Sequence, residues 1–236
     1  MSTRLPRILT ALCGILGVAA LVAHFSIPAQ VPPANATVAQ VTEFAKQDHA
    51  TILVSAWLEG IGSLLFVLFV LAIVHLAGAT TRFAGWITML AAAVILAVSL
   101  LDVTFYIAVV QAAASGHPAT TAISFDLISD LVGGDAVGHV FVIAPPLLLP
   151  LGAVILGSRV LPRVFGYLAV AFGVAIVILG FAGLFSATAD TVITFVLSAQ
   201  ELWIVAAAIT LVLRAGKPVV AGRGVAQPVV QAGPTS

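Results

Sequence analysis

The stretch TILVSAWLEGIGSLLFVLFVLAIVHLA, from Thr51 to Ala77, contains a single formally charged side chain, Glu59. A helix needs about 20 apolar residues to cross the ~30 Å hydrocarbon core of a bilayer. A continuous apolar run of this length favours a helix, because barrel strands are shorter and alternate between apolar and polar residues. The stretch therefore predicts a membrane-spanning helix that carries one carboxyl group.

The composition of the whole chain agrees with this interpretation. Of its 236 residues, 61% are hydrophobic and only 8% are charged, and the mean hydropathy is +1.22, whereas soluble domains are about half apolar. The formal net charge is zero, so no basic surface is available to bind nucleic acid. A single cysteine, Cys13, excludes an internal disulfide and a cysteine-based metal site. The chain is thus expected to be an integral membrane protein whose surroundings are the lipid bilayer.

Six segments are apolar and long enough to span a membrane. They lie at about 8–28, 51–77, 84–112, 136–157, 164–186 and 192–213. We therefore expect an all-α fold, a bundle of six transmembrane helices within residues 1–215. Residues 216–236 are rich in Gly, Pro, Val and Ala without helical periodicity, which predicts a flexible cytoplasmic tail.

The positive charges predict the orientation of the bundle. Eight of them fall on one side of the six expected spans, and only Lys46 falls on the other; the eight are Arg4, Arg7, Arg82, Arg159, Arg163, Arg214, Lys217 and Arg223. Short loops rich in Lys and Arg remain in the cytoplasm. Both termini are therefore expected on the cytoplasmic side of the cell membrane.

The first span has a competing interpretation as a cleaved signal peptide. Arg4 and Arg7 precede an apolar run, and the triplet Ala34-Asn35-Ala36 follows it. The run is longer than a signal-peptide core, and the triplet is distant from its end. An uncleaved first span is the favoured interpretation.

The two connections expected on the outer side each predict a short helix. In the first, Val38, Val41, Phe44 and Ala45 recur at helical spacing after a proline-rich piece. In the second, the turn Gly116-His117-Pro118 precedes another apolar series, Ile123, Leu127, Ile128 and Leu131. We expect this second helix to lie along the outer membrane surface.

A short pattern occurs twice in the chain. Arg82-Phe83-Ala84-Gly85-Trp86 opens the third expected span, and Arg163-Val164-Phe165-Gly166-Tyr167 opens the fifth. Each copy places an arginine at the cytoplasmic interface and an aromatic side chain one turn inward, as membrane anchors do. The pattern also suggests a repeat of two helical hairpins.

Four ionisable side chains lie within the expected spans, namely Glu59, Asp102, His139 and Glu201. Such groups are costly in a bilayer and commonly mark binding sites or proton pathways. Glu59, Asp102 and His139 each lie about 27 Å from the expected cytoplasmic end of their span, and Glu201 about 18 Å. The first three are thus expected to form one layer near the outer interface, with Glu201 beneath it.

These residues, with Asp135 four positions before His139, are the candidate ligand- or ion-binding group. The competing interpretation is that Glu59 and His139 reach the headgroups and that Asp102 only bonds a neighbouring helix. The other histidines, His24, His49, His75 and His117, are interpreted as ordinary interfacial residues. A metal-binding H-E-x-x-H motif is absent, and we expect no catalytic residue, metal or cofactor.

Three prolines interrupt the fourth expected span, at Pro145, Pro146 and Pro150. Each removes a backbone hydrogen bond and disfavours a straight helix, so a kink or break is expected. A broken helix lines the substrate site in many transporters, whereas a packing kink has no direct role in function. The packing kink is the favoured interpretation.

The stretch LGAVILGSRVLPRVFGYL, residues 151–168, carries a resemblance to a known group of proteins. It is similar to the loop-and-helix signature of a bacterial family of multi-pass inner-membrane proteins of unknown function. The resemblance implies a six-helix fold in the inner membrane. It implies no catalytic residue, because the S-R-x-L-P-R-x-x-G segment is an anchoring motif without chemistry.

Three functional classes remain open from the sequence. The first is a transporter or sensor that binds a small ligand, cation or proton at an outward-facing acidic and histidine vestibule. The second is an intramembrane enzyme that uses the carboxylates and His139 on a lipid-like substrate. The third is a structural membrane protein, and of these the first is preferred.

Overall fold

The computed structural model describes residues 4–27, 32, 36–128, 136–183 and 187–215, without the side chains of 128, 136–143, 183, 187–191, 193 and 194. These residues form helices and connecting turns, with no strand among them. The helices are α1 (Arg4–Ser26), α2 (Val38–Gln47), α3 (His49–Leu76), α4 (Phe83–Ala114), α5 (Pro118–Ile128), α6 (Ala136–Leu156), α7 (Arg163–Gly183) and α8 (Ala187–Ala215). The expected all-helical fold is confirmed for this part of the chain.

Five of the helices, α1, α3, α4, α7 and α8, are long and apolar enough to cross a membrane. In α6, the apolar segment whose side chains are described, Ala144–Leu156, is shorter than a span. The structure therefore supports a membrane-embedded helical bundle, and the sixth span remains a prediction. The predicted tail, 216–236, lies outside the described residues.

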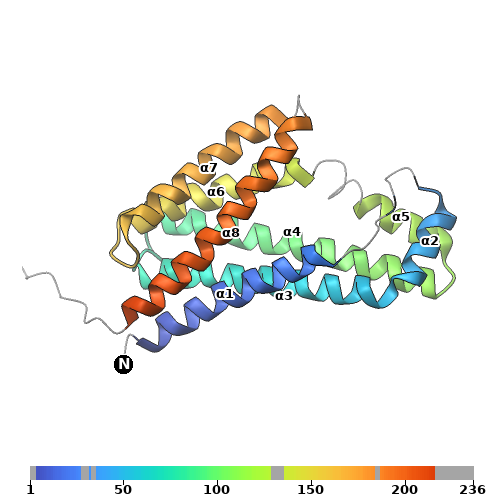
Figure 1. Cartoon of the computed structure of the whole chain (residues 1–236), viewed down its shortest axis with the longest axis horizontal. Helices are drawn as coiled ribbons and strands as arrows, with labels where there is room; N and C mark the ends of the chain where they lie inside the picture. Colours follow the sequence, from blue (N-terminus) through green and yellow to red (C-terminus); the bar gives the residue numbers. More distant parts are fainter. Residues whose placement is uncertain (1–3, 28–31, 33–35, 129–135, 184–186, 216–236) are drawn as a thin grey trace, which may run out of the picture.

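The six long helices form a ring in which each packs against two neighbours. Along the ring the order is α1, α3, α4, α6, α7 and α8, and α8 closes it by packing against α1. In Figure 1, α1 and α8 lie next to each other near the N-terminal label and diverge from there, and α3 and α4 run side by side. The long helices follow one another around the ring in the same order as in the sequence. Each is therefore connected to a neighbour in space, as is usual in helical bundles.

An apolar core fills the ring where all six helices meet. Its fully buried side chains include Phe69 and Ile73 of α3, Leu151 and Ile155 of α6, and Leu211 of α8. Large apolar side chains are also exposed on the outside of these helices. Helices that are apolar on both their inner and outer faces suit a bundle surrounded by lipid.

One end of the bundle gathers the beginnings of α1, α4 and α7 and the ends of α3, α6 and α8 (Figure 1). We call this the arginine-rich end, after Arg4, Arg7, Arg82, Arg159, Arg163 and Arg214. Here the Nη1 of Arg7 donates a hydrogen bond of 2.8 Å to the Arg214 carbonyl oxygen. A cation at a helix C-terminus satisfies a free carbonyl and interacts favourably with the helix dipole. The described beginning and end of the chain are therefore tied together.

The repeated R-x-x-G-aromatic pattern opens α4 and α7. Gly85 packs against the turn that ends α3, so closely that a Cβ atom there would overlap the Ala79 carbonyl oxygen. Gly166 packs against Leu156 and the backbone of α6 in the second hairpin. Both predicted anchors, Trp86 and Tyr167, are exposed. The glycine of each copy thus permits close helix packing, a function that the sequence analysis did not assign.

Helices α3 and α4 extend beyond what a bilayer requires. With 28 and 32 residues, they measure about 42 and 48 Å, against a hydrocarbon core of ~30 Å. At the end opposite the arginine-rich end, α2 and α5 pack against each other and against α4 (Figure 1). We call these two short helices, with the ends of α3 and α4 that they contact, the helical cap.

The helical cap is held by its own small apolar clusters. Val41, Ala45 and Phe125 are buried against α4, and Phe44 is buried between α3 and α4. The predicted apolar face of α2 is confirmed at Val41, Phe44 and Ala45, although Val38 is exposed. In α5, Ile123 and Leu127 are exposed, and its position along the membrane surface stays a prediction. Phe125 is buried because α5 packs on α2 and α4.

A capping box fixes the start of α2. The Gln40 backbone N–H donates to the Thr37 hydroxyl oxygen, while Gln40 Oε1 accepts from the Thr37 backbone N–H. We expect Thr37→Ala to destabilise α2 by about 1 kcal/mol, because an orphan backbone donor loses its acceptor. Hydrogen exchange of the α2 amides measures this loss. Thr42→Ala is the control, since Thr42 only bonds back to the Val38 carbonyl within the helix; equal exchange in both variants would contradict the prediction.

Helix α6 runs through Pro145, Pro146 and Pro150 as one helix, from Ala136 to Leu156. The chain therefore does not break at these prolines in the structure. Side chains next to them, Ala144, Leu147 and Leu148, are buried against neighbouring helices. The burial of these side chains favours a packing role for this segment.

Candidate functional site

A group of polar side chains lies between α1, α3 and α4, on the side of the apolar core that is nearer the helical cap. It consists of His24 from α1, Ser55 and Glu59 from α3, and Asp102 and Tyr106 from α4. We call these five residues the polar cluster.

Helical periodicity turns the two carboxyl groups toward the inside of the ring. Glu59 shares a helical face with Ser63, Val70 and Ile73, which are all buried. Asp102 shares a face with Ala91 and Val109, which are also buried. The two carboxyl groups therefore approach each other across the α3–α4 interface.

The carboxyl groups of Glu59 and Asp102 are close neighbours that interact electrostatically. A carboxylate has only acceptors, so a hydrogen bond between two carboxyl groups requires that one of them carries a proton. If both carboxyl groups were ionised, their negative charges would repel each other strongly, because they are close together and shielded from water. The pair is thus arranged to hold a proton between two helices.

His24 approaches the same pair from α1. Its Nδ1 lies 2.8 Å from the Ser55 hydroxyl oxygen and 3.1 Å from the Ser55 carbonyl oxygen. Its Nε2 lies 3.9 Å from Glu59 Oε2, which is an ion-pair distance and too long for a hydrogen bond. His24 also interacts electrostatically with Asp102. A protonated imidazole here would balance the negative charge left by one ionised carboxyl group.

Two oxygens of the pair have unused hydrogen-bonding capacity. Glu59 Oε2 and Asp102 Oδ1 are buried and have no hydrogen-bond partner in the described part of the chain. Buried polar atoms are normally satisfied, and exceptions concentrate where a group has a task besides stability. The lone pairs of these oxygens are therefore available to a proton or a small ligand.

The polar cluster is shielded but not sealed. The side chain of Glu59 is 13% exposed and that of His24 is 19% exposed. Tyr106 interacts electrostatically with both Glu59 and Asp102 and packs against the apolar clusters of the helical cap. The cluster thus lies between the apolar core on one side and the helical cap on the other.

The structure brings together two of the residues that the sequence predicted as a site. Glu59 and Asp102 lie at the same depth, as the distance along each span predicts. Ser55 lies one helical turn from Glu59, and Tyr106 lies one turn from Asp102. His139 lies within α6, but its side chain is not among those described, and Asp135 lies outside the described residues. The predicted contribution of these two residues is therefore untested.

Glu201 stands apart from the polar cluster. It lies on α8, which packs against α1 and α7, and among the described residues it makes no hydrogen bond or ion pair with Glu59, Asp102 or His24. Its neighbour Gln200 has a buried Oε1 without a hydrogen-bond partner in the same part of the chain. The polar groups of α8 thus form a separate location rather than a deeper layer of the same site.

Sequence reasoning missed His24, which it assigned to the ordinary interfacial histidines. Its depth was an available signal, because it lies about 25 Å along α1 from the arginine-rich end, close to the value for Glu59. The packing of α1 on α3 was not available, and it is this contact that places the imidazole beside Ser55.

No group of three or more His, Cys, Asp or Glu side chains is placed to hold a metal ion within the described ranges. Comparisons with protein-family models, with curated proteins and with solved structures find no match to this chain. The chemistry of the polar cluster is therefore the basis for a functional proposal.

Proposed function

We propose that this protein is a proton-linked membrane transporter that binds and releases a proton at Glu59 and Asp102, with His24 as the balancing cation. The observation that carries the proposal is the close approach of two buried carboxyl groups, each with an unpartnered oxygen, within helices long and apolar enough to span a membrane. Carboxyl and histidine groups inside membrane helices characteristically form proton relays.

The charges of the cluster support a proton rather than a metal ion as the bound species. With one proton on the carboxyl pair and another on His24, the cluster is neutral. Loss of the shared proton leaves a net negative charge among apolar side chains, which is unfavourable unless the helices move or water enters. Proton binding is thereby coupled to the packing of α1, α3 and α4, as a transporter requires.

The proposal includes six spans with both termini in the cytoplasm. In support, the connections that carry the arginines all lie at one end of the bundle (Figure 1), and the positive charge predicts that end to be cytoplasmic. The polar cluster then lies in the outer half of the membrane, beneath the helical cap. Protons would reach it from the outer side, as expected for an outward-facing vestibule.

Infrared spectroscopy of the protein in lipid vesicles, recorded across a pH series, tests the proposal. Protonated carboxyl groups have a carbonyl stretch that carboxylates lack. We expect one pH-dependent band from the shared proton, and we expect both Glu59→Gln and Asp102→Asn to remove that same band. Glu43→Gln is the control, because Glu43 is exposed on α2 and bonds only to Gln47.

Two results would count against the proposal. One is a spectrum in which Glu59→Gln and Asp102→Asn remove different bands, which would mean that the two groups titrate independently. The other is a shared band that does not respond to pH in the wild-type protein, which would mean that the proton is structural and is not exchanged.

A further inference from the structure

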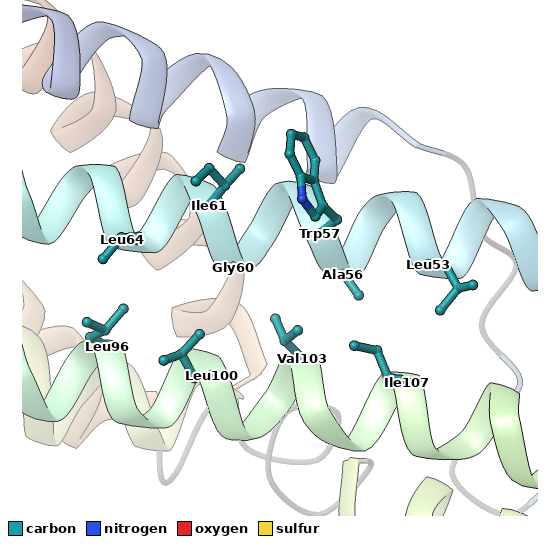
Figure 2. Close-up of a pocket in the computed structure, with 10 residues that line it drawn as sticks. All are labelled: Leu53, Ala56, Trp57, Gly60, Ile61, Leu64, Leu96, Leu100, Val103 and Ile107. Carbon is teal, nitrogen blue, oxygen red and sulfur yellow. The ribbon is translucent and has the colours of Figure 1, made fainter.

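An apolar groove lies on the outer side of the ring, between α3 and α4. On α3 it is lined from Leu53 to Leu64 and on α4 from Leu96 to Ile107, with a volume of about 420 Å³. In Figure 2, Leu53, Ala56 and Leu64 of α3 point toward α4, whereas Ile61 and Trp57 point away from it. Every lining residue is apolar or glycine, so the groove contains no group that would bind a charged or polar ligand.

Gly60 shapes the middle of the groove. Without a side chain it leaves space in the wall, and the nearest atoms that a Cβ would meet are the Val103 methyl carbons, at 3.7 and 3.9 Å. Gly60 and Val103 directly follow Glu59 and Asp102 in the chain. The groove and the polar cluster therefore occupy the same level of α3 and α4 but lie on different helical faces.

The groove reaches from the outer half of the hydrocarbon core into the headgroup region. Counted from the end of α3 at Leu76, it begins at Leu64, about 18 Å away, and ends at Leu53, about 34 Å away. The hydrocarbon core is ~30 Å thick. About 12 Å of the groove thus lies within the core, in the half that is farther from the arginine-rich end.

Trp57 stands at the edge of the groove and is 66% exposed. It lies about 28 Å from the end of α3, where the hydrocarbon core gives way to the headgroups. Tryptophan side chains concentrate at this boundary, with the ring among the acyl chains and the N–H near the headgroups. The position of Trp57 therefore marks the headgroup end of an acyl chain in the groove.

We propose that the α3–α4 groove is a binding site for one acyl chain of a phospholipid from the outer leaflet. The apolar lining, the depth in the outer half of the hydrocarbon core and a tryptophan at the headgroup level together specify this occupant. The inference rests on the membrane location in the proposed function, but it does not depend on proton binding.

Quenching of tryptophan fluorescence by phospholipids with brominated acyl chains tests this site. Two variants report separately: Trp86→Phe keeps Trp57, and Trp57→Phe keeps Trp86, which is 64% exposed at the beginning of α4. Trp203 is buried and remains in both. In detergent with a limiting amount of brominated lipid, we expect quenching of Trp57 to saturate at a stoichiometric lipid ratio, whereas quenching of Trp86 increases only with excess lipid.

Filling the groove should remove the difference between the two tryptophans. In the Trp86→Phe background, Gly60→Leu is expected to abolish quenching at limiting lipid, and Leu100→Phe, on the opposite wall, to weaken it. Ala97→Leu is the matched control, because Ala97 is exposed on α4 outside the groove. Circular dichroism shows which variants fold, and Leu100→Phe keeps the test decisive should Gly60→Leu unfold.

Two results would overturn the acyl-chain site. One is that the quenching of Trp57 and of Trp86 depends in the same way on the amount of brominated lipid. The other is that quenching of Trp57 persists in both Gly60→Leu and Leu100→Phe. Quenching of Trp86 in vesicles with none of Trp57 would also overturn it, and would indicate that another protein surface covers the groove. If neither tryptophan is quenched in vesicles, the membrane location itself fails, which is distinct from a failure of the groove alone.

Discussion

Gly85→Ala is expected to destabilise the protein by about 3 kcal/mol, at the upper end of what overpacking costs. A Cβ at this position would overlap the Ala79 carbonyl oxygen and approach Val74. The Ala79 oxygen also accepts a hydrogen bond from the Arg82 backbone N–H, so the turn cannot move aside without losing that bond. Unfolding of the detergent-solubilised variant, followed by circular dichroism, measures the loss.

Gly60→Ala is the matched control for this prediction, since Gly60 lies in the adjacent helix and meets only side-chain atoms at ordinary contact distance. There, alanine is expected to raise stability by about 0.5–1 kcal/mol, because it restricts the unfolded chain and favours the helix. Equal effects at the two glycines would show that the turn between α3 and α4 is not as tightly packed as the structure has it.

Removing both members of the carboxyl pair is expected to cost less stability than the sum of the two single removals. Glu59→Leu leaves Asp102 buried without its partner, and Asp102→Leu does the same to Glu59, with an expected loss of about 2–4 kcal/mol each. The double variant replaces the pair by apolar side chains, so its loss should be smaller than the sum by roughly 1–3 kcal/mol. A double-mutant cycle in the unfolding assay gives this coupling free energy.

Glu201 supplies the comparison for the cycle. Because α8 packs on α1 and α7 and Glu201 does not contact the pair, the losses for Glu59→Leu and Glu201→Leu should add within about 0.5 kcal/mol. If Glu59 and Glu201 were coupled as strongly as Glu59 and Asp102, the result would support the arrangement expected from the sequence, in which Glu201 lies beneath the other ionisable residues in one vestibule.

The sequence predicts the helices well because their apolar runs are long and few residues interrupt them. The expected segment 51–77 corresponds to α3, His49–Leu76, and 84–112 corresponds to α4, Phe83–Ala114. The helical cap was harder to predict. The burial of Phe125 against α2 and α4 could not be predicted, since the buried face of a short helix depends on the neighbours that it meets.

For the polar cluster, the sequence predicts how deep each residue lies in the membrane, but it does not predict which helices are neighbours in the ring. Distances along the spans correctly placed Glu59 and Asp102 at one level, because helix rise is constant. They could not place Glu201 relative to this pair, since that depends on which helices are neighbours in the ring. They also gave no reason to prefer His24 over the other histidines, because its role arises from the packing of α1 against α3.

The contact between α1 and α8, the first and last of the described helices, has a consequence for how the protein is made. Ribosomes add roughly 5–20 residues per second, so α1 enters the membrane roughly 10–40 s before α8 is complete. During that time the guanidinium of Arg7 lacks the Arg214 carbonyl that it later binds, and the flank of α1 that α8 covers faces lipid or the insertion machinery. Assembly therefore ends with a closing step at the arginine-rich end, and a chain truncated before α8 would remain an open arc of helices.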